Sequence, residues 1–203
     1  IGTDIPFWVD EIENCINYTK LDELKLNLES TKIFHLKSKN DKLFALNEIK
    51  KYCKSCMNST KERLISQLRD VTGIISSTAD CPNYQIMNWD EVNELSENKN
   101  FIIGGHSMYH EILSSLEIEQ MKKNIRDSVT LLNNKLNKKI THYSYPEGQK
   151  LHYNDEVIAE LKKNNIVCSP SAIHGKADIN EGLFHLKRVM VGFNGTNFPY
   201  DLI

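Results

Sequence analysis

The sequence lacks the features that would indicate a charged binding partner or a membrane-spanning segment. It has no run of five like charges, and its 25 Lys and Arg residues nearly balance 27 Asp and Glu residues, for a net charge of −2. That balance favours neither a nucleic-acid groove nor an anionic membrane surface. No apolar run approaches the roughly 18 residues that span a bilayer, so we expect no membrane segment. With 203 residues, 40% of them apolar, the chain can bury one core, which predicts one folded domain.

A disulfide framework and a signal peptide are lacking too. Five cysteines is an odd number in a chain too long to need disulfide staples, which favours thiols in a reducing compartment and predicts a cytoplasmic location. Residues 1–7 have neither the basic start nor the apolar stretch of a signal peptide. The first residue is Ile1 rather than Met, so we expect the chain to be a piece of a longer protein.

The first 70 residues favour helices. Apolar residues recur at spacings near 3.6 over 8–19 and again over 40–70, where a break near 58–59 predicts two consecutive helices. Between them, alternating leucines over 24–28 and a second apolar stretch over 33–36 predict a small β-hairpin. We therefore expect a mainly helical region here.

The second half alternates short apolar runs with amphipathic helices. Asn88, with acidic residues after it, predicts a capped helix start. Further along, strands and helices are predicted in turn over 101–105, 118–137, 140–145, 154–164 and 166–168. This order is typical of parallel βαβ units, so the fold class we expect is α/β.

Ligand sites in parallel α/β proteins lie just past the carboxyl ends of the strands. His106 and His110 follow the first predicted strand four residues apart, a spacing that on one helical turn points both imidazoles to the same side, where they can share a divalent metal. An H-x-x-x-H pattern is common by chance, and two surface or capping histidines are the alternative. After the next strand, residues 143–148 (YSYPEG) form a Pro/Gly turn that could aim a backbone N–H into a cleft.

These motifs resemble those of the polysaccharide deacetylases, the carbohydrate esterase family with the NodB homology domain. Residues 87–92 (MNWDEV) and 102–113 (IIGGHSMYHEIL) look like the family's "mtWdev … eIGsHtxxHpxL" segment. Residues 143–148 are similar to its "FaYPyG" element, and 186–189 (LKRV) to its late "LpRi" element. The start FWVDE, residues 7–11, resembles a helical insertion found in members linked to bacterial surface polysaccharides.

The resemblance implies a single domain over 1–203 with a distorted (β/α) barrel. The barrel portion would be 71–203, and 8–70 would be the helical insertion. The implied activity is that of a metal-dependent hydrolase that removes acetyl groups from N- or O-acetylated sugars of a bacterial surface or cell-wall polysaccharide. A carbohydrate is therefore the expected partner, and the oligomeric state stays open.

The resemblance also implies roles for particular residues. His106 and His110 would hold Zn²⁺ or a similar divalent ion, which lowers the pKa of bound water and polarises the acetyl carbonyl. The backbone N–H of Glu147 would meet the oxyanion, and Arg188 would supply a nearby positive charge. The sugar-binding residues would be Tyr145, which shapes the floor of the cleft, and Pro146.

The sequence departs from the family pattern in ways that leave alternatives open. Nothing in residues 1–7 matches the "TFDDG" motif of the family's first strand, so we expect the chain to lack the first strand, the catalytic base and the third metal ligand. His185 has the letters of the family's L-x-H general-acid motif, although the residues after it align better with the arginine-bearing strand. One alternative is therefore a non-catalytic carbohydrate-binding member of the same fold. Another is a generic metal-binding protein that uses Cys53 and Cys56, for which ordinary thiols are the simpler interpretation.

Overall fold

The computed structural model describes residues 1–3, 5–75 and 85–189. It divides the chain into two units, residues 1–94 and 95–203, and the boundary falls within helix α4 (Trp89–Glu97). Asn88 caps this helix as expected, since its Oδ1 accepts the backbone N–H groups of Asp90 and Glu91. The predicted organisation as one domain with an insertion and a barrel portion stays a prediction.

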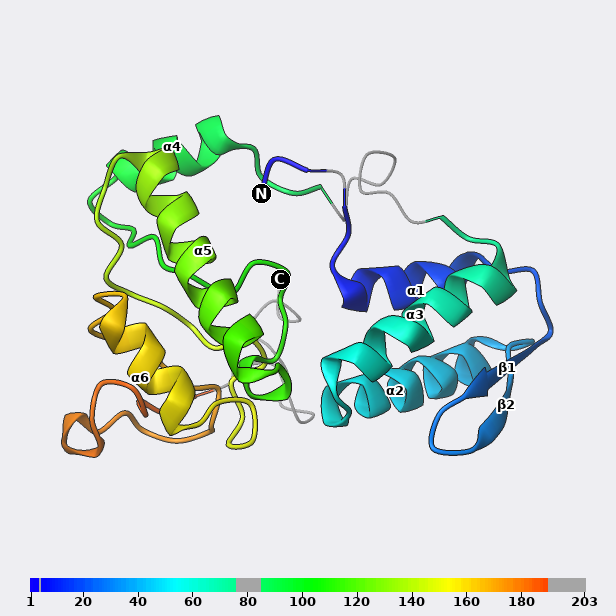
Figure 1. Ribbon diagram of the computed structural model, residues 1–203. Coiled ribbons are helices and arrows are strands. Elements are labelled where there is room, and N and C mark those ends of the chain that lie inside the picture. The colour runs from blue at the N-terminus through cyan, green and yellow to red at the C-terminus, as the bar shows by residue number, and fades with distance from the viewer. Residues whose placement is uncertain (4, 76–84, 190–203) are drawn as a thin grey trace, which may run out of the picture. The chain divides into compact units, whose positions relative to one another are not determined.

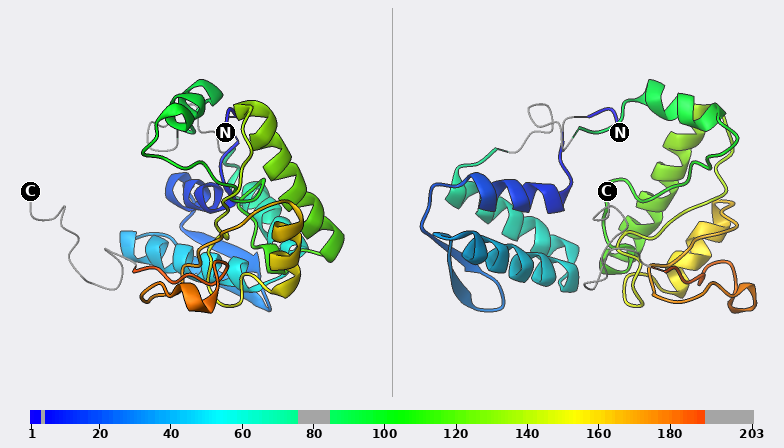
Figure 2. Two further views of the ribbon diagram at one scale, coloured as in Figure 1. Left: turned by 90° about the vertical axis from the view of Figure 1, so that its left-hand side faces the viewer. Right: turned by 180° about the vertical axis from the view of Figure 1, so that it is seen from behind.

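The first unit is a small helical layer with one hairpin. Its elements are α1 (Trp8–Tyr18), β1 (Glu23–Asn27), β2 (Thr31–His35), α2 (Lys39–Ser55) and α3 (Asn58–Thr72). Helix α1 packs against α2 and α3, while α3 contacts β1 and α2 contacts β2 (Figure 1). Figure 2 shows the three helices side by side from two other directions.

Local signals fix the elements of this unit. The two strands pair antiparallel with Leu24 opposite Phe34, and both side chains are buried. Helix α2 begins with a capping box, in which Ser38 and Asp41 each accept the other's backbone N–H. The core that results is lined by Ile12, Cys15, Ile16, Leu24, Leu26, Ile49, Ile65 and Leu68. The predicted helices and hairpin are confirmed, although the break between α2 and α3 lies at residues 56–57 rather than 58–59.

The second unit contains the helices α5 (Ile118–Leu136) and α6 (Asp155–Lys163), which pack against each other (Figure 1). Short 3₁₀ turns occur at η2 (Leu113–Ser115) and η3 (Ile179–Glu181). The face that α5 buries carries Met121, Asn124, Ile125, Ser128, Val129, Leu132 and Leu136. Both helices confirm the periodicity of the sequence.

The predicted strands 101–105, 140–145 and 166–168 do not form regular strands. They meet in isolated parallel bridges that join Gly105 to Tyr143 and His142 to Cys168. Extended backbone becomes a regular strand only where successive N–H and C=O groups find partners. Here Phe101 and Ile102 are 53% and 72% exposed, so no burial stabilises the start of the first run.

The parallel direction of these segments is nevertheless as predicted. A third parallel bridge joins His174 to Arg188. Within the described ranges, the one regular sheet is the β1–β2 hairpin, and the expected barrel is not confirmed. No helix among the described residues is both long and apolar enough to cross a bilayer.

Candidate functional site

An open cleft of about 450 Å³ lies in the second unit, past the points where the parallel segments pair. Five of the six predicted site residues line it together with two others, the full lining being His106, His110, Ser144, Tyr145, Glu147, Ala172 and Arg188. The sixth, Pro146, is buried within the bend and is not among the lining residues. Segments far apart in the sequence therefore meet past the carboxyl ends of the parallel segments, which is where ligand sites of α/β proteins lie.

Glycine at position 105 allows the first two segments to approach. The N–H of Gly105 donates to the carbonyl of His142 (3.0 Å), and its own carbonyl accepts from Ser144 (2.8 Å). A Cβ at Gly105 would lie 2.5 Å from Cδ2 of Tyr143. Only glycine therefore lets the backbone pass over the buried tyrosine ring.

Tyr143 then anchors the turn that carries the histidines. Its hydroxyl accepts the backbone N–H of Ser107 at 2.7 Å. Burial raises the pKa of Tyr143 to about 12, so the phenol stays protonated at physiological pH. The sequence reasoning missed this residue, although its place in the predicted strand after Gly105 was a usable signal.

The segment from His106 to His110 is a loop, so the expectation of one helical turn is wrong. Ser107 and His110 adopt left-handed φ angles of 64° and 56°, which no helix contains. The two imidazoles converge all the same, with ring centroids 4.9 Å apart and planes inclined by 67°. Their convergence depends on the loop shape rather than on helical periodicity.

The hydrogen bond of His106 fixes which ring nitrogen is available. Its Nδ1 lies 2.7 Å from the carbonyl oxygen of Ser144. A carbonyl only accepts, so Nδ1 carries the proton and Nε2 keeps its lone pair. The pKa of His106 is lowered, chiefly by loss of hydration and also by the positive charge of Arg188. The hydrogen bond to Ser144 and the negative charge of Glu147 raise this pKa, but by less. A neutral imidazole with a free Nε2 lone pair is the form that binds metals.

The donor set fits part of a zinc site. Two imidazole nitrogens on one cleft suit Zn²⁺ or a similar ion, and the hydrogen bond of His106 to a carbonyl is the usual support for a metal-binding histidine. Zinc enzymes use three protein ligands, however. Over residues 1–3, 5–75 and 85–189, no group of three or more His, Cys, Asp or Glu side chains lies close enough to hold an ion.

Comparison with known families decides the identity of the fold. A family model described as polysaccharide deacetylase matches residues 54–168, more than half of the chain. The chain belongs to the polysaccharide deacetylase family. The resemblance of its motifs to that family is thus confirmed.

Solved structures of deacetylases resemble this family member. The Streptococcus pyogenes deacetylase PplD, solved in complex with acetate, shares 16% identity at a TM-score of 0.50, over 69% of this chain and 62% of that one. This chain therefore spans less than two thirds of that protein. A de-N-acetylase from Aggregatibacter actinomycetemcomitans shares 15% identity (TM-score 0.46, 71% of each chain). A polysaccharide deacetylase from Bacillus cereus shares 20% (TM-score 0.43, 65% of this chain and 42% of that one).

The likeness to PplD and the mixed helix and strand content show an α/β fold of the NodB type. No curated protein matches the sequence significantly.

In this deacetylase-family chain, the bend after Tyr143 lines the cleft, and its role as the floor stays a prediction. Tyr145 is 1% exposed, stacks on Tyr153 at 4.0 Å and donates its hydroxyl proton to the carbonyl of Phe184 (3.1 Å). Burial raises the pKa of Tyr145 well above its ordinary value. The ring is therefore fixed, and a ligand would meet a rigid surface.

The bend itself turns through two left-handed residues. Glu147 and Gly148 have φ angles of 60° and 62°, and the Gly148 carbonyl accepts from the N–H of Ala172 (2.8 Å). A Cβ at Gly148 would lie 2.8 Å from that same nitrogen, which requires glycine. Glu147 is thereby presented at the cleft, and its backbone role towards an oxyanion stays a prediction.

Arg188 reaches the cleft from the last described segment. Its Nε donates to the carbonyl of Ser171 (2.6 Å), and its backbone N–H donates to Ile173 (3.0 Å). His185 is not among the lining residues, and its ring lies 5.9 Å from that of Tyr153. The arginine of the late motif, rather than the histidine before it, belongs to the cleft wall.

The Cys53–Cys56 pair has the properties of ordinary thiols. Burial raises the pKa of Cys53 to about 12 and that of Cys56 above its usual value. Metal-binding and redox-active thiols instead need a lowered pKa, because the thiolate is the reactive form. The interpretation as a second metal site loses support.

Proposed function

We propose that this chain belongs to a metal-dependent deacetylase that removes acetyl groups from N- or O-acetylated sugars of a bacterial surface or cell-wall polysaccharide. The observation that supports it best is that His106 and His110 converge beside the Tyr145–Gly148 bend in a single cleft. The protein from Streptococcus pyogenes was solved with acetate, the product of such a reaction.

Different residues of this chain would have different roles in the reaction. His106 and His110 would hold the divalent ion, with Zn²⁺ as the first candidate. When bound, such an ion acidifies a water molecule and polarises the acetyl carbonyl. The Ser144 carbonyl keeps the proton of His106 on Nδ1, and the backbone N–H of Glu147 would stabilise the oxyanion.

The remaining cleft residues would bind and orient the sugar. Tyr145 offers a rigid apolar floor because its ring is held by Tyr153. Arg188, which lines the same cleft, would place a positive charge beside the reacting groups, where negative charge develops. Pro146 would contribute through the shape of the bend. A cytoplasmic location is also part of the proposal, supported by the free thiols of the four described cysteines.

Acetate release by the full-length protein tests the proposal. Acetylated oligosaccharides are incubated with the wild type, with chelator-treated protein and with chelator-treated protein resupplied with Zn²⁺. We expect release that chelation abolishes and Zn²⁺ restores. His106→Ala should lower the release of acetate at least about a hundredfold, because the ion loses one of its imidazole ligands.

His35→Ala is the matched control, since His35 lies on β2 outside the cleft. Its activity should stay within about twofold of the wild type, as for most surface substitutions. The enzyme proposal is wrong if metal-replete full-length protein releases no acetate from N- or O-acetylated glycans, or if His106→Ala changes nothing.

A non-catalytic carbohydrate-binding member is the second candidate. It is favoured by the two-residue donor set, since the described part of the chain gathers no third ligand at the cleft. Binding of an acetylated oligosaccharide, measured by calorimetry without any release of acetate, would support it. Tyr145→Ala should then weaken binding.

A further inference from the structure

The loop that carries the two histidines needs outside support for its shape. Ser107 and His110 both have left-handed φ angles, which are unfavourable for residues with a side chain. The segment is irregular, so no helical or strand ladder holds its backbone. Hydrogen bonds from other parts of the chain must therefore fix it.

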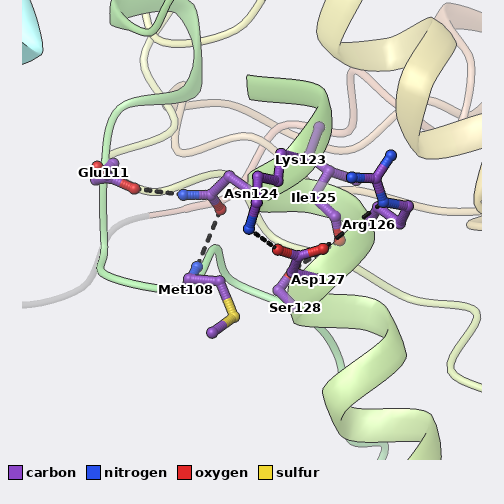
Figure 3. A network of polar contacts seen from close by, with 8 residues as sticks. All are labelled: Met108, Glu111, Lys123, Asn124, Ile125, Arg126, Asp127 and Ser128. Atoms are coloured by element: carbon purple, nitrogen blue, oxygen red, sulfur yellow. Dashed lines mark hydrogen bonds and ion pairs between the residues drawn. The ribbon is translucent and has the colours of Figure 1, made fainter. Parts of the chain in front are cut away.

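One buried amide supplies two of these bonds. Asn124 is 8% exposed and lies on the buried face of α5. Its Oδ1 accepts the backbone N–H of Met108 at 3.0 Å, and its Nδ2 donates to Oε2 of Glu111 (Figure 3). Since a backbone N–H can only donate, the orientation of this amide is fixed. Met108 lies between the two histidines, and Glu111 directly follows the second.

Glu111 closes the ring of contacts. Its backbone N–H donates to Oγ of Ser107 at 3.1 Å, so Glu111, which follows His110, is tied to Ser107, which follows His106, as well as to Asn124 on α5. As long as residue 111 is a carboxylate, position 124 needs a side chain that is both donor and acceptor. Leucine offers neither, and a carboxylate offers only acceptors.

We propose that Asn124, acting through Met108 and Glu111, is a positioning residue that holds His106 and His110 in the geometry that binds a divalent cation. The proposal rests on the metal site of the proposed function. Asn124 does not line the cleft, so it acts only through the loop. Groups that orient metal ligands in this way commonly change metal affinity by 10- to 100-fold when removed.

The first test measures the affinity of the full-length protein for Zn²⁺ alone, by competition with a chromophoric indicator. Asn124→Leu should bind at least about tenfold more weakly than the wild type. Asn134→Leu is the matched control, because Asn134 is an exposed asparagine on the same helix, and it should bind as the wild type does.

Amide hydrogen exchange gives a readout that does not depend on metal. In Asn124→Leu the Met108 amide should exchange at least about fivefold faster, because its acceptor is gone, while amides in the middle of α5 keep their protection. Faster exchange throughout the unit would mean a general loss of stability and would overturn a specific positioning role.

Exchanging the two partners is the more decisive test. Asn124→Asp puts a second carboxylate against Glu111 and should weaken Zn²⁺ binding at least about tenfold. Glu111→Gln alone keeps an acceptor for the Asn124 amide and should stay within about threefold. In the double variant N124D/E111Q, the amide at position 111 donates to the carboxylate at position 124, the reverse of the wild-type bond. Its affinity for Zn²⁺ should recover to within about threefold of the wild type. Affinity that stays as weak as in N124D overturns the proposal.

The outcomes separate this proposal from the proposed function. If the wild type binds no Zn²⁺, or if His106→Ala leaves binding unchanged, the metal site itself is wrong. If His106→Ala abolishes binding while Asn124→Leu does not alter it, the metal site stands and the positioning role is refuted.

Discussion

Replacing Tyr143 by phenylalanine removes one buried oxygen atom and tests how the histidine loop is held. The ring is 2% exposed, and its hydroxyl accepts the Ser107 N–H at 2.7 Å. A partly buried donor left without its acceptor costs about 1–3 kcal/mol. We therefore expect Tyr143→Phe to lower the free energy of unfolding by about that amount, since the apolar ring contacts remain.

Urea denaturation at pH 7 measures this change. Tyr109→Phe is the control, because Tyr109 lies in the same loop with 65% of its side chain exposed. It should stay within about 0.5 kcal/mol of the wild type. The reasoning is refuted if the two variants lose equal stability.

The same phenol gives a dependence on pH. Its pKa in the folded protein is about 12, against a usual value of 10, so the folded state holds this proton more tightly than the unfolded state does. This proton therefore contributes fully to the free energy of unfolding below pH 10. Its contribution is lost as the pH rises towards 12, at about 1.4 kcal/mol per pKa unit. Tyr143→Phe should lose stability less steeply over this range than the wild type. Parallel curves for the two proteins would contradict the assignment.

Three further predictions concern Gly105, Cys53 and the capping box of Ser38 and Asp41. Gly105→Ala should cost about 1–3 kcal/mol in urea denaturation, because its Cβ would meet the Tyr143 ring at 2.5 Å; a change below 0.5 kcal/mol would show that the ring can move. Cys53 should resist alkylation by iodoacetamide at pH 8 until the protein is denatured, as judged by mass spectrometry, since its pKa is about 12; rapid labelling of native protein would restore the reactive-thiol interpretation. Ser38→Ala should lower the free energy of unfolding by about 1 kcal/mol through loss of the α2 cap, and Asp41→Ala by a similar amount if the box acts reciprocally.

The helices and the hairpin could be predicted because their determinants are local. Apolar spacing and caps such as Asn88 specify helices within a few residues of themselves. The hairpin pairs Leu24 with Phe34, only ten positions away, in the register that buries both. The strand bounds could not be predicted in the same way, because pairing depends on distant partners. Gly105 pairs with Tyr143 in a parallel bridge, whereas Ile102 is exposed.

By itself the sequence determined which chemical groups are present and in what order, and its motifs were enough to identify the family. Only the tertiary structure decided how His106 and His110 converge, since the expected helical turn does not form. The bonds that shape their loop come from Tyr143, 36 residues from its partner Ser107, and from Asn124 on α5. Residues with left-handed φ angles need such contacts from elsewhere in the chain to be stable. The sequence motif around the two histidines does not reveal which residues make these contacts.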